Sequence, residues 1–62
     1  MLQDTITTYK RKITNLTNYM RLKIDEQDWH AVADAAMDIR EYEAKIDLAK
    51  AILASDYLLD KE

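Results

Sequence analysis

Hydrophobic residues recur along the first third of the chain at intervals of three and four. The stripe comprises Leu2, Ile6, Tyr9, Ile13, Leu16, Met20 and Ile24. At about 100° per residue these positions fall within one narrow sector of a helix. The pattern therefore predicts an α-helix over about residues 4–24 that packs along a single seam, with Asp4 or Thr5 as its N-cap.

Four polar residues, Asp25-Glu26-Gln27-Asp28, interrupt this pattern. Asp25 and Asp28 are both suitable N-caps for a second helix. We place a turn at about residues 25–27 and the second helix at about residues 28–59. Because so short a connection makes neighbouring helices run antiparallel, residues 1–62 are predicted to form one all-α, antiparallel two-helix hairpin.

The second predicted helix carries apolar residues on two opposite sides. The side expected to face the first helix, with Trp29 at its margin to cover the turn, comprises Val32, Ala35, Ala36, Ile39, Tyr42, Ile46, Leu53 and Tyr57. The other side comprises Ala33, Met37, Ala44, Leu48, Ala51, Ile52 and Leu59. A helix that is apolar on both sides needs a second surface to pack against.

The second helix is also longer than the first, about 47 Å against about 30 Å at 1.5 Å per residue. Asp4 then lies opposite Leu48, and we expect the remainder to overhang without cover from the first helix. The alternative is a break at Ser55-Asp56 that folds the tail back, which the absence of Gly and Pro disfavours. The predicted partner or oligomer interface consists of Leu48, Ile52, Leu53, Tyr57, Leu58 and Leu59.

Composition makes association the remaining common way to stabilise this chain. A core built from 62 residues is marginal. The sequence has no Cys for disulfides, no Cys/His cluster for a structural metal, and no Gly to occupy a left-handed turn position. We therefore expect a homo-oligomer, most simply a symmetric dimer whose hairpins form a helical bundle.

The same composition argues against catalysis. One His and no Gly exclude a serine nucleophile elbow and a phosphate-binding loop. His30, Asp34 and Asp38 recur every four residues, but zinc sites need three or four ligands and di-iron bundles need Glu-x-x-His motifs from two helices. We expect no enzymatic activity, no metal and no cofactor.

Charge is divided unevenly between the two halves. Residues 1–24 carry a net charge of +4 and residues 25–62 a net charge of −7. The bases Lys10, Lys12, Arg21 and Lys23 flank the first stripe, and the acids Asp38, Glu43, Asp47 and Asp56 flank the facing one. We expect ion pairs across the seam rather than a nucleic-acid surface. A candidate acidic partner strip comprises Asp34, Asp38 and Glu41.

Two resemblances bear on function. The segment Asp28-Trp29-His30-Ala31-Val32-Ala33-Asp34-Ala35-Ala36, followed by Ile39-Arg40-Glu41, resembles a run in small phage proteins of helical-hairpin type. That resemblance implies a viral accessory protein and brings no known activity. The two-helix layout and acidic turn are also similar to the Rop family of plasmid copy-number regulators, whose hairpins dimerise and bind paired RNA loops. The unequal helices depart from that family, and its RNA-contacting face has no residue-by-residue match here.

The sequence thus predicts a protein–protein interaction module: a phage-encoded accessory protein or host-enzyme inhibitor that binds itself or a host protein through an apolar helical surface. The alternative is a Rop-like regulator that binds nucleic acid through the basic first helix, which is the less favoured partner. No run of about 18 apolar residues predicts a membrane span. The first residues lack the pattern of a secretory signal, so we expect a cytoplasmic protein, in the host cytoplasm if viral.

Overall fold

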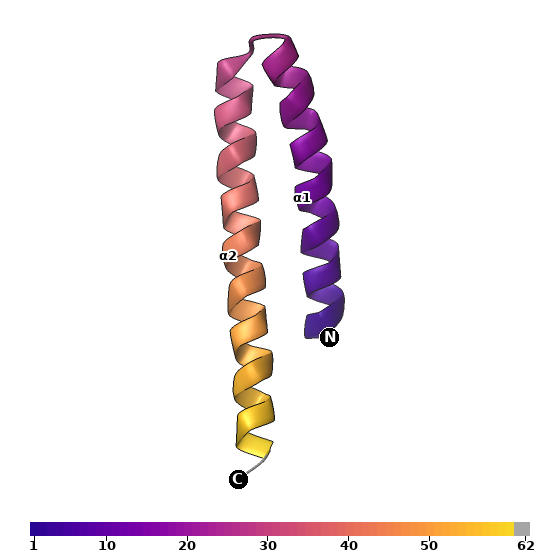
Figure 1. The fold of residues 1–62 in the computed structure, drawn as a ribbon, viewed down its shortest axis with the longest axis vertical. Coiled ribbons are helices and arrows are strands. Elements are labelled where there is room, and N and C mark those ends of the chain that lie inside the picture. Colours follow the sequence, from indigo (N-terminus) through magenta and orange to yellow (C-terminus); the bar gives the residue numbers. More distant parts are fainter. Residues whose placement is uncertain (61–62) are drawn as a thin grey trace.

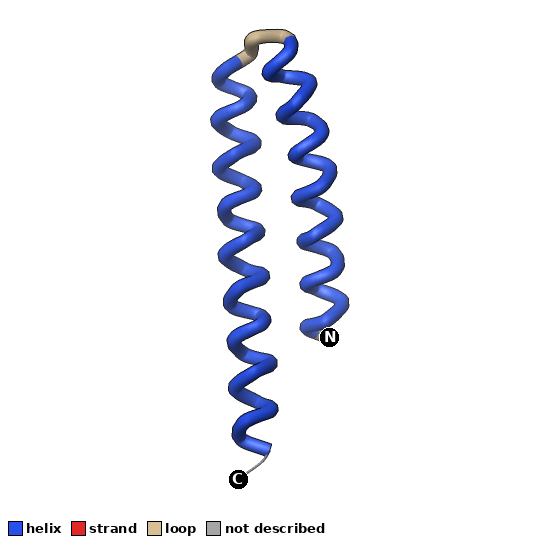
Figure 2. Tube along the Cα trace, in the orientation of Figure 1, coloured by secondary structure: helices blue, strands red, loops and turns tan. Residues whose placement is uncertain are grey.

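The computed structural model describes the backbone of residues 1–60 and the side chains of residues 1–55. Two α-helices, α1 (Leu2–Asp25) and α2 (Trp29–Asp60), make up this part of the chain. They run antiparallel and are joined by one short loop (Figures 1 and 2). The predicted all-α hairpin is confirmed. Helix α2 continues through Ser55 and Asp56 without a break, as expected.

The loop is built on a left-handed residue, although the sequence offers no Gly. Gln27 has a φ of 57°. Its backbone N–H donates to the carbonyl of Ile24 at 2.9 Å, and the N–H of Asp28 donates to the carbonyl of Lys23 at 2.9 Å. These two bonds define a Schellman motif, which satisfies carbonyls at the end of α1. Our expectation that the chain has no left-handed turn residue was wrong, because a non-glycine residue accepts that conformation at a modest energetic cost.

The two helices begin differently. Asp28 caps α2, since its Oδ1 accepts a hydrogen bond from the N–H of Ala31 at 3.2 Å. Helix α1 begins at Leu2, with Met1 as an N-cap that makes no side-chain bond. Asp4 and Thr5, the predicted caps, lie inside the first turns instead, and the Thr5 hydroxyl donates back to the carbonyl of Met1 at 3.1 Å.

The seam between the helices holds the core, but it is thin. The buried hydrophobic side chains are Ile6, Ala35, Ile46 and Ala49. Around Ile6, Ile46 and Ala49, the half-buried side chains of Leu2, Tyr9, Ile13 and Leu53 complete the packing. No side chain among residues 1–55 is fully buried.

Three predictions about the seam need correction. Ala36 is exposed rather than packed, because it lies about 100° around the helix from buried Ala35. Ala49, which we did not place in the seam, is 5% exposed. Leu53 packs on the core, as does Leu2, because α1 begins two residues earlier than predicted and covers about half a turn more of α2.

The hairpin is a single layer. Its extents are 54 × 16 × 11 Å, as expected of two helices lying side by side. Helix α2 runs past the start of α1 (Figure 1). Since Leu53 is covered, the overhang comprises residues 54–60, about 10 Å of helix. Among the described residues, no further helix covers either face of this layer or the side of α2 that points away from α1.

The left-handed residue yields a stability prediction. Gln27→Gly should raise the free energy of unfolding by about 1 kcal/mol, because glycine has no Cβ to strain at positive φ. Thermal unfolding followed by circular dichroism measures the change. Gln27→Ala is the matched control and should give no such gain, since alanine keeps the Cβ. Equal midpoints for the wild type and the glycine variant would contradict the role assigned to Gln27.

Candidate protein-interaction surface

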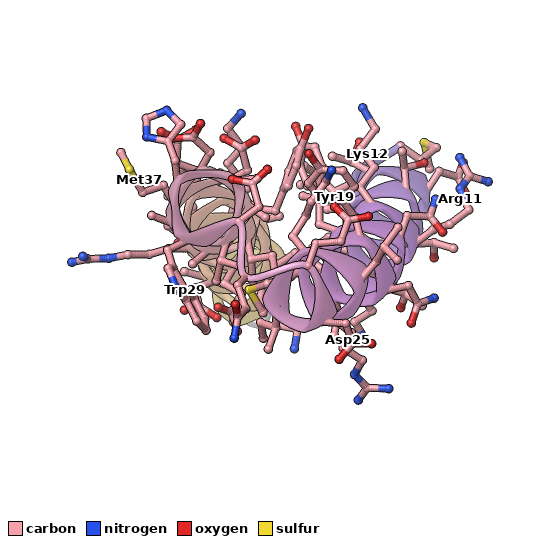
Figure 3. All side chains as sticks on the ribbon, turned by 90° about the horizontal axis from the view of Figure 1, so that it is seen from above. Arg11, Lys12, Tyr19, Asp25, Trp29 and Met37 are labelled. Atoms are coloured by element: carbon pink, nitrogen blue, oxygen red, sulfur yellow. The ribbon has the colours of Figure 1, made fainter. Side chains whose placement is uncertain are left out.

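The side of α2 that faces away from α1 carries a row of exposed apolar residues, interrupted by Arg40 and Glu41. We call this the outer face of α2; it comprises Ala33, Met37, Ala44, Leu48, Ala51 and Ile52, all exposed. The Met37 and Leu48 side chains are 63% and 62% exposed. Figure 3 shows Met37 directed away from α1. Exposed apolar residues gathered on one face of a helix are typical of an interaction site.

The outer face of α1 is different in character. Arg11 points away from α2 at the far side of the hairpin (Figure 3). Its neighbours on that side, at helical spacing, are Asp4, Asn15 and Asn18, and Leu22 is the one large apolar residue among them. The apolar surplus of the hairpin therefore lies on α2.

The predicted interface residues divide into three groups. Leu48 and Ile52 are exposed on the outer face of α2. Leu53 faces the seam and is half-buried against the core, so the expectation that it lacks cover within the chain was wrong. The side chains of Tyr57, Leu58 and Leu59 lie outside the described residues. Leu48 is exposed because of the side of α2 it occupies rather than because it overhangs, since adjacent Ala49 is buried.

A shallow groove of about 310 Å³ indents the outer face of α2. Its lining residues are Met37, Arg40, Glu41 and Ala44, and most of the lining surface is apolar. Met37 was predicted to lie on this side of α2, but neither Met37 nor Arg40 was among the predicted interface residues. The spacing of the four lining residues was the signal that could have found them. A second hollow, of about 300 Å³ at the start of α1, is lined by Met1, Asp4, Thr5, Thr8 and Tyr9 and is more polar.

The candidate acidic strip is present on the exposed surface of α2. Asp34, Asp38 and Glu41 are all exposed. Asp34 Oδ2 lies 3.4 Å from His30 Nε2, which is an ion pair when the imidazole is protonated. Within the described residues no group of three or more side chains is arranged to hold a metal ion.

Ion pairs across the seam, which we expected from the flanking charges, are absent among residues 1–55. Lys12 instead lies over the Tyr42 ring at 5.6 Å. Lys45 of α2 lies 5.5 Å from the Tyr42 ring and 5.7 Å from the Tyr9 ring. The two tyrosine rings are 5.3 Å apart across the seam. Aromatic rings offer these lysines a nearby attractive surface without the ordering of two long side chains that an exposed ion pair requires.

Lys23 closes the turn end of the hairpin. Its Nζ lies 3.0 Å from Glu26 Oε1 and 4.0 Å from Asp28 Oδ2, and 5.5 Å above the Tyr19 ring. The hydrogen bond from Lys23 to Glu26 and the charge of Glu26 raise the pKa of Lys23 above 10.5. The Lys23–Asp28 contact joins C3 and C″ of the Schellman motif, positions where a hydrophobic contact is usual.

Trp29 and the remaining bases occupy other surfaces. Trp29 is 61% exposed and projects from the opposite side of the hairpin to Lys12 and Tyr19 (Figure 3), so it does not cover the turn as expected. At about 100° per residue, Lys10 and Arg21 lie on one side of α1, Lys12 on the other and Arg11 behind. The cations of α1 therefore form no single stripe.

Comparison with protein-family models, curated proteins and solved structures finds no match. The resemblances to phage hairpin proteins and to the Rop family stay predictions. Neither described helix has the length and apolar character needed to cross a bilayer.

The turn contact makes a pH prediction. Because the folded-state pKa of Lys23 is raised above 10.5, its protonated form stabilises the hairpin at pH values below 10.5, and this contribution is lost as the pH rises through the folded-state pKa. Lys23→Gln should therefore be less stable than the wild type near neutral pH, and the two should converge at high pH. Urea unfolding across the pH range measures this. In a Glu26→Gln background the same substitution should have a smaller effect; an equal effect would contradict the assigned pairing.

Proposed function

We propose that this chain is a protein–protein interaction module that binds its partner through the outer face of α2. The observation that carries the proposal is the row of exposed apolar side chains on that face, which includes Met37 and Leu48. Burying one such side chain contributes roughly 1.5–3 kcal/mol. Removing two or three of them from water therefore gives a substantial driving force for association.

The thin seam supports the same proposal. The hairpin buries only one side of each helix, and its buried residues include two alanines, Ala35 and Ala49. Two-helix hairpins of this size gain stability by packing against further helices. Association at the outer face of α2 leaves the seam intact because Leu48 and Ile52 lie outside the hydrophobic core cluster. We propose only which surface binds and that its partner is a protein. A phage accessory or inhibitory role stays a prediction from the sequence.

The test substitutes the surface without touching the core. Leu48→Asp with Ile52→Asp places two charges on the outer face, where burial would leave them desolvated. We expect this double variant to lose binding by at least tenfold, to both an untagged second copy and any protein retained from the source-cell lysate by the immobilised wild-type chain. Circular dichroism should still show a folded helical chain, since both positions are exposed.

Leu22→Asp is the matched control. Leu22 is 52% exposed, so the substitution also replaces an exposed leucine by aspartate, but on α1. It should leave binding unchanged. If the outer-face variant binds as tightly as the wild type, or if Leu22→Asp abolishes binding equally, the outer face of α2 is not the interaction surface. Binding to RNA that weakens steeply with salt and is unaffected by Leu48→Asp would instead favour the nucleic-acid alternative.

A further inference from the structure

The groove on the outer face of α2 has the geometry of a hole in a coiled coil. Its four lining residues, Met37, Arg40, Glu41 and Ala44, stand at positions i, i+3, i+4 and i+7. Four residues with this spacing form the diamond into which one side chain of a facing helix inserts in knobs-into-holes packing. Ala44 at one corner leaves the hole open, and Met37 at the other gives it an apolar wall.

Such diamonds recur along every helix, and two further features distinguish this one. The hollow at the start of α1 also contains an i, i+3, i+4, i+7 set, but Asp4, Thr5 and Thr8 make it polar. The groove on α2 lies one turn from Leu48, which is 62% exposed on the same face. One face thus carries both an apolar hole and a large apolar side chain able to fill one. Self-complementarity of this kind is what a two-fold symmetric interface requires.

We propose that a second copy of this chain docks on the outer face of α2, antiparallel to the first, with Leu48 of each copy inserted into the groove of the other. The proposal rests on the proposed function of this face and names the partner. The groove is centred between Arg40 and Glu41. Placing Leu48 of the second copy opposite that point puts Ala44 on the two-fold axis, where its small side chain permits close approach of the helices.

This register brings opposite charges together. In an antiparallel symmetric pair of helices, each edge of the face meets the same edge of the other copy. Arg40 and Asp47 lie on one edge, and Glu41 and Lys45 on the other, at about 100° per residue. With Ala44 on the axis, Arg40 lies opposite Asp47 of the second copy and Glu41 lies opposite Lys45 of the second copy. Symmetry repeats both pairs, giving four.

Three of the four charged side chains are free of other contacts of this kind. Arg40, Glu41 and Asp47 are exposed, and none of them makes an ion pair with another residue in the part of the chain that the structure describes. Lys45 is exposed and also makes no ion pair there, but its Nζ lies over the Tyr42 and Tyr9 rings, so its pair with Glu41 requires a change of rotamer. The register was placed from the groove and Leu48 without regard to the signs of the charges, so the match of opposite signs supports it separately. Charge complementarity of this type selects orientation and register more than it adds affinity.

A parallel pair lacks this agreement. It would place the acidic turn residues Asp25, Glu26 and Asp28 beside the same residues of the second copy, because the helices would begin at the same end. It would also align the two helix dipoles in the same direction, which is less favourable than the antiparallel arrangement. The antiparallel arrangement separates the two acidic turns by the length of α2.

The size of the face sets the expected affinity. From Ala33 to Ser55 it is about 33 Å long, and with a helix width of about 10–12 Å the two copies bury roughly 700 Å² in total. That is below the size of standard specific interfaces, so we expect a weak, reversible dimer with a Kd in the micromolar range or above.

Cysteine cross-linking tests orientation directly, since the chain has no Cys of its own. Under mild oxidation, Ala44→Cys should form a disulfide-linked dimer because both copies place residue 44 on the axis. Ala33→Cys alone should not, because the two sites lie at opposite ends of the interface. An equimolar mixture of Ala33→Cys and Ser55→Cys should cross-link, since these positions face each other. Circular dichroism of the reduced variants confirms that each remains helical.

Charge exchange tests the register independently. Arg40→Glu should weaken self-association about tenfold, because it turns two attractive contacts into repulsive ones. Adding Asp47→Arg should restore the wild-type Kd. Arg11→Glu, a charge reversal on the far side of α1, should leave the Kd unchanged.

Each outcome decides between defined alternatives. Cross-linking of Ala33→Cys to itself, or failure of Ala44→Cys to cross-link at concentrations where the wild type is dimeric, overturns the antiparallel register. A wild-type chain that is monomeric at millimolar concentration overturns the self-docking proposal. If that monomer still binds another protein, and the double substitution Leu48→Asp with Ile52→Asp abolishes this binding, the proposed function stands while this inference fails.

Discussion

Two packed helices can each bury only one side, and the rest of this molecule depends on that constraint. The seam closes around Ile6, Ile46 and Ala49, and the hairpin is a single layer of two helices. If each helix had only one apolar stripe, a two-helix layer would cover all of the apolar surface. Here α1 follows that pattern, whereas α2 is apolar on both sides, so one of its faces stays uncovered. The functional proposal follows from this difference between two adjacent helices.

The turn determines which residues meet across the seam. The Schellman bonds at Gln27 and Asp28, the Asp28 cap and the Lys23 contacts together hold the start of α2 against the end of α1. That register places Tyr9 beside Tyr42 and Leu2 against the cluster that includes Ala49 and Leu53. It also orients α2 about its axis, so that Met37, Ala44 and Leu48 face away from α1. The bonds at the turn and the packing of the seam together leave this side of α2 exposed.

Much of the fold could be predicted because hydrophobic spacing reports helix faces directly. The α1 stripe, the polar turn and the two-sided character of α2 were all evident in the sequence. Ala49 was missed although it continues the spacing of Tyr42, Ile46 and Leu53, because alanine gives a weak hydrophobic signal. The left-handed Gln27 was missed because residue preference argues against it, and the bonds at the turn outweigh that preference. The prediction of ion pairs across the seam was wrong. The sequence shows which edge of a helix a lysine occupies but not which rotamer its side chain adopts, and Lys12 and Lys45 lie against tyrosine rings instead.

The central claim is that association through the outer face of α2 completes a hairpin whose own core is thin. The concentration dependence of thermal unfolding tests it most directly, since association stabilises the folded chain by mass action. Between about 5 and 500 µM the account predicts a midpoint that rises by several degrees for the wild type and stays constant for Leu48→Asp with Ile52→Asp. A wild-type midpoint that is independent of concentration, with a monomeric mass in sedimentation equilibrium throughout, would contradict it.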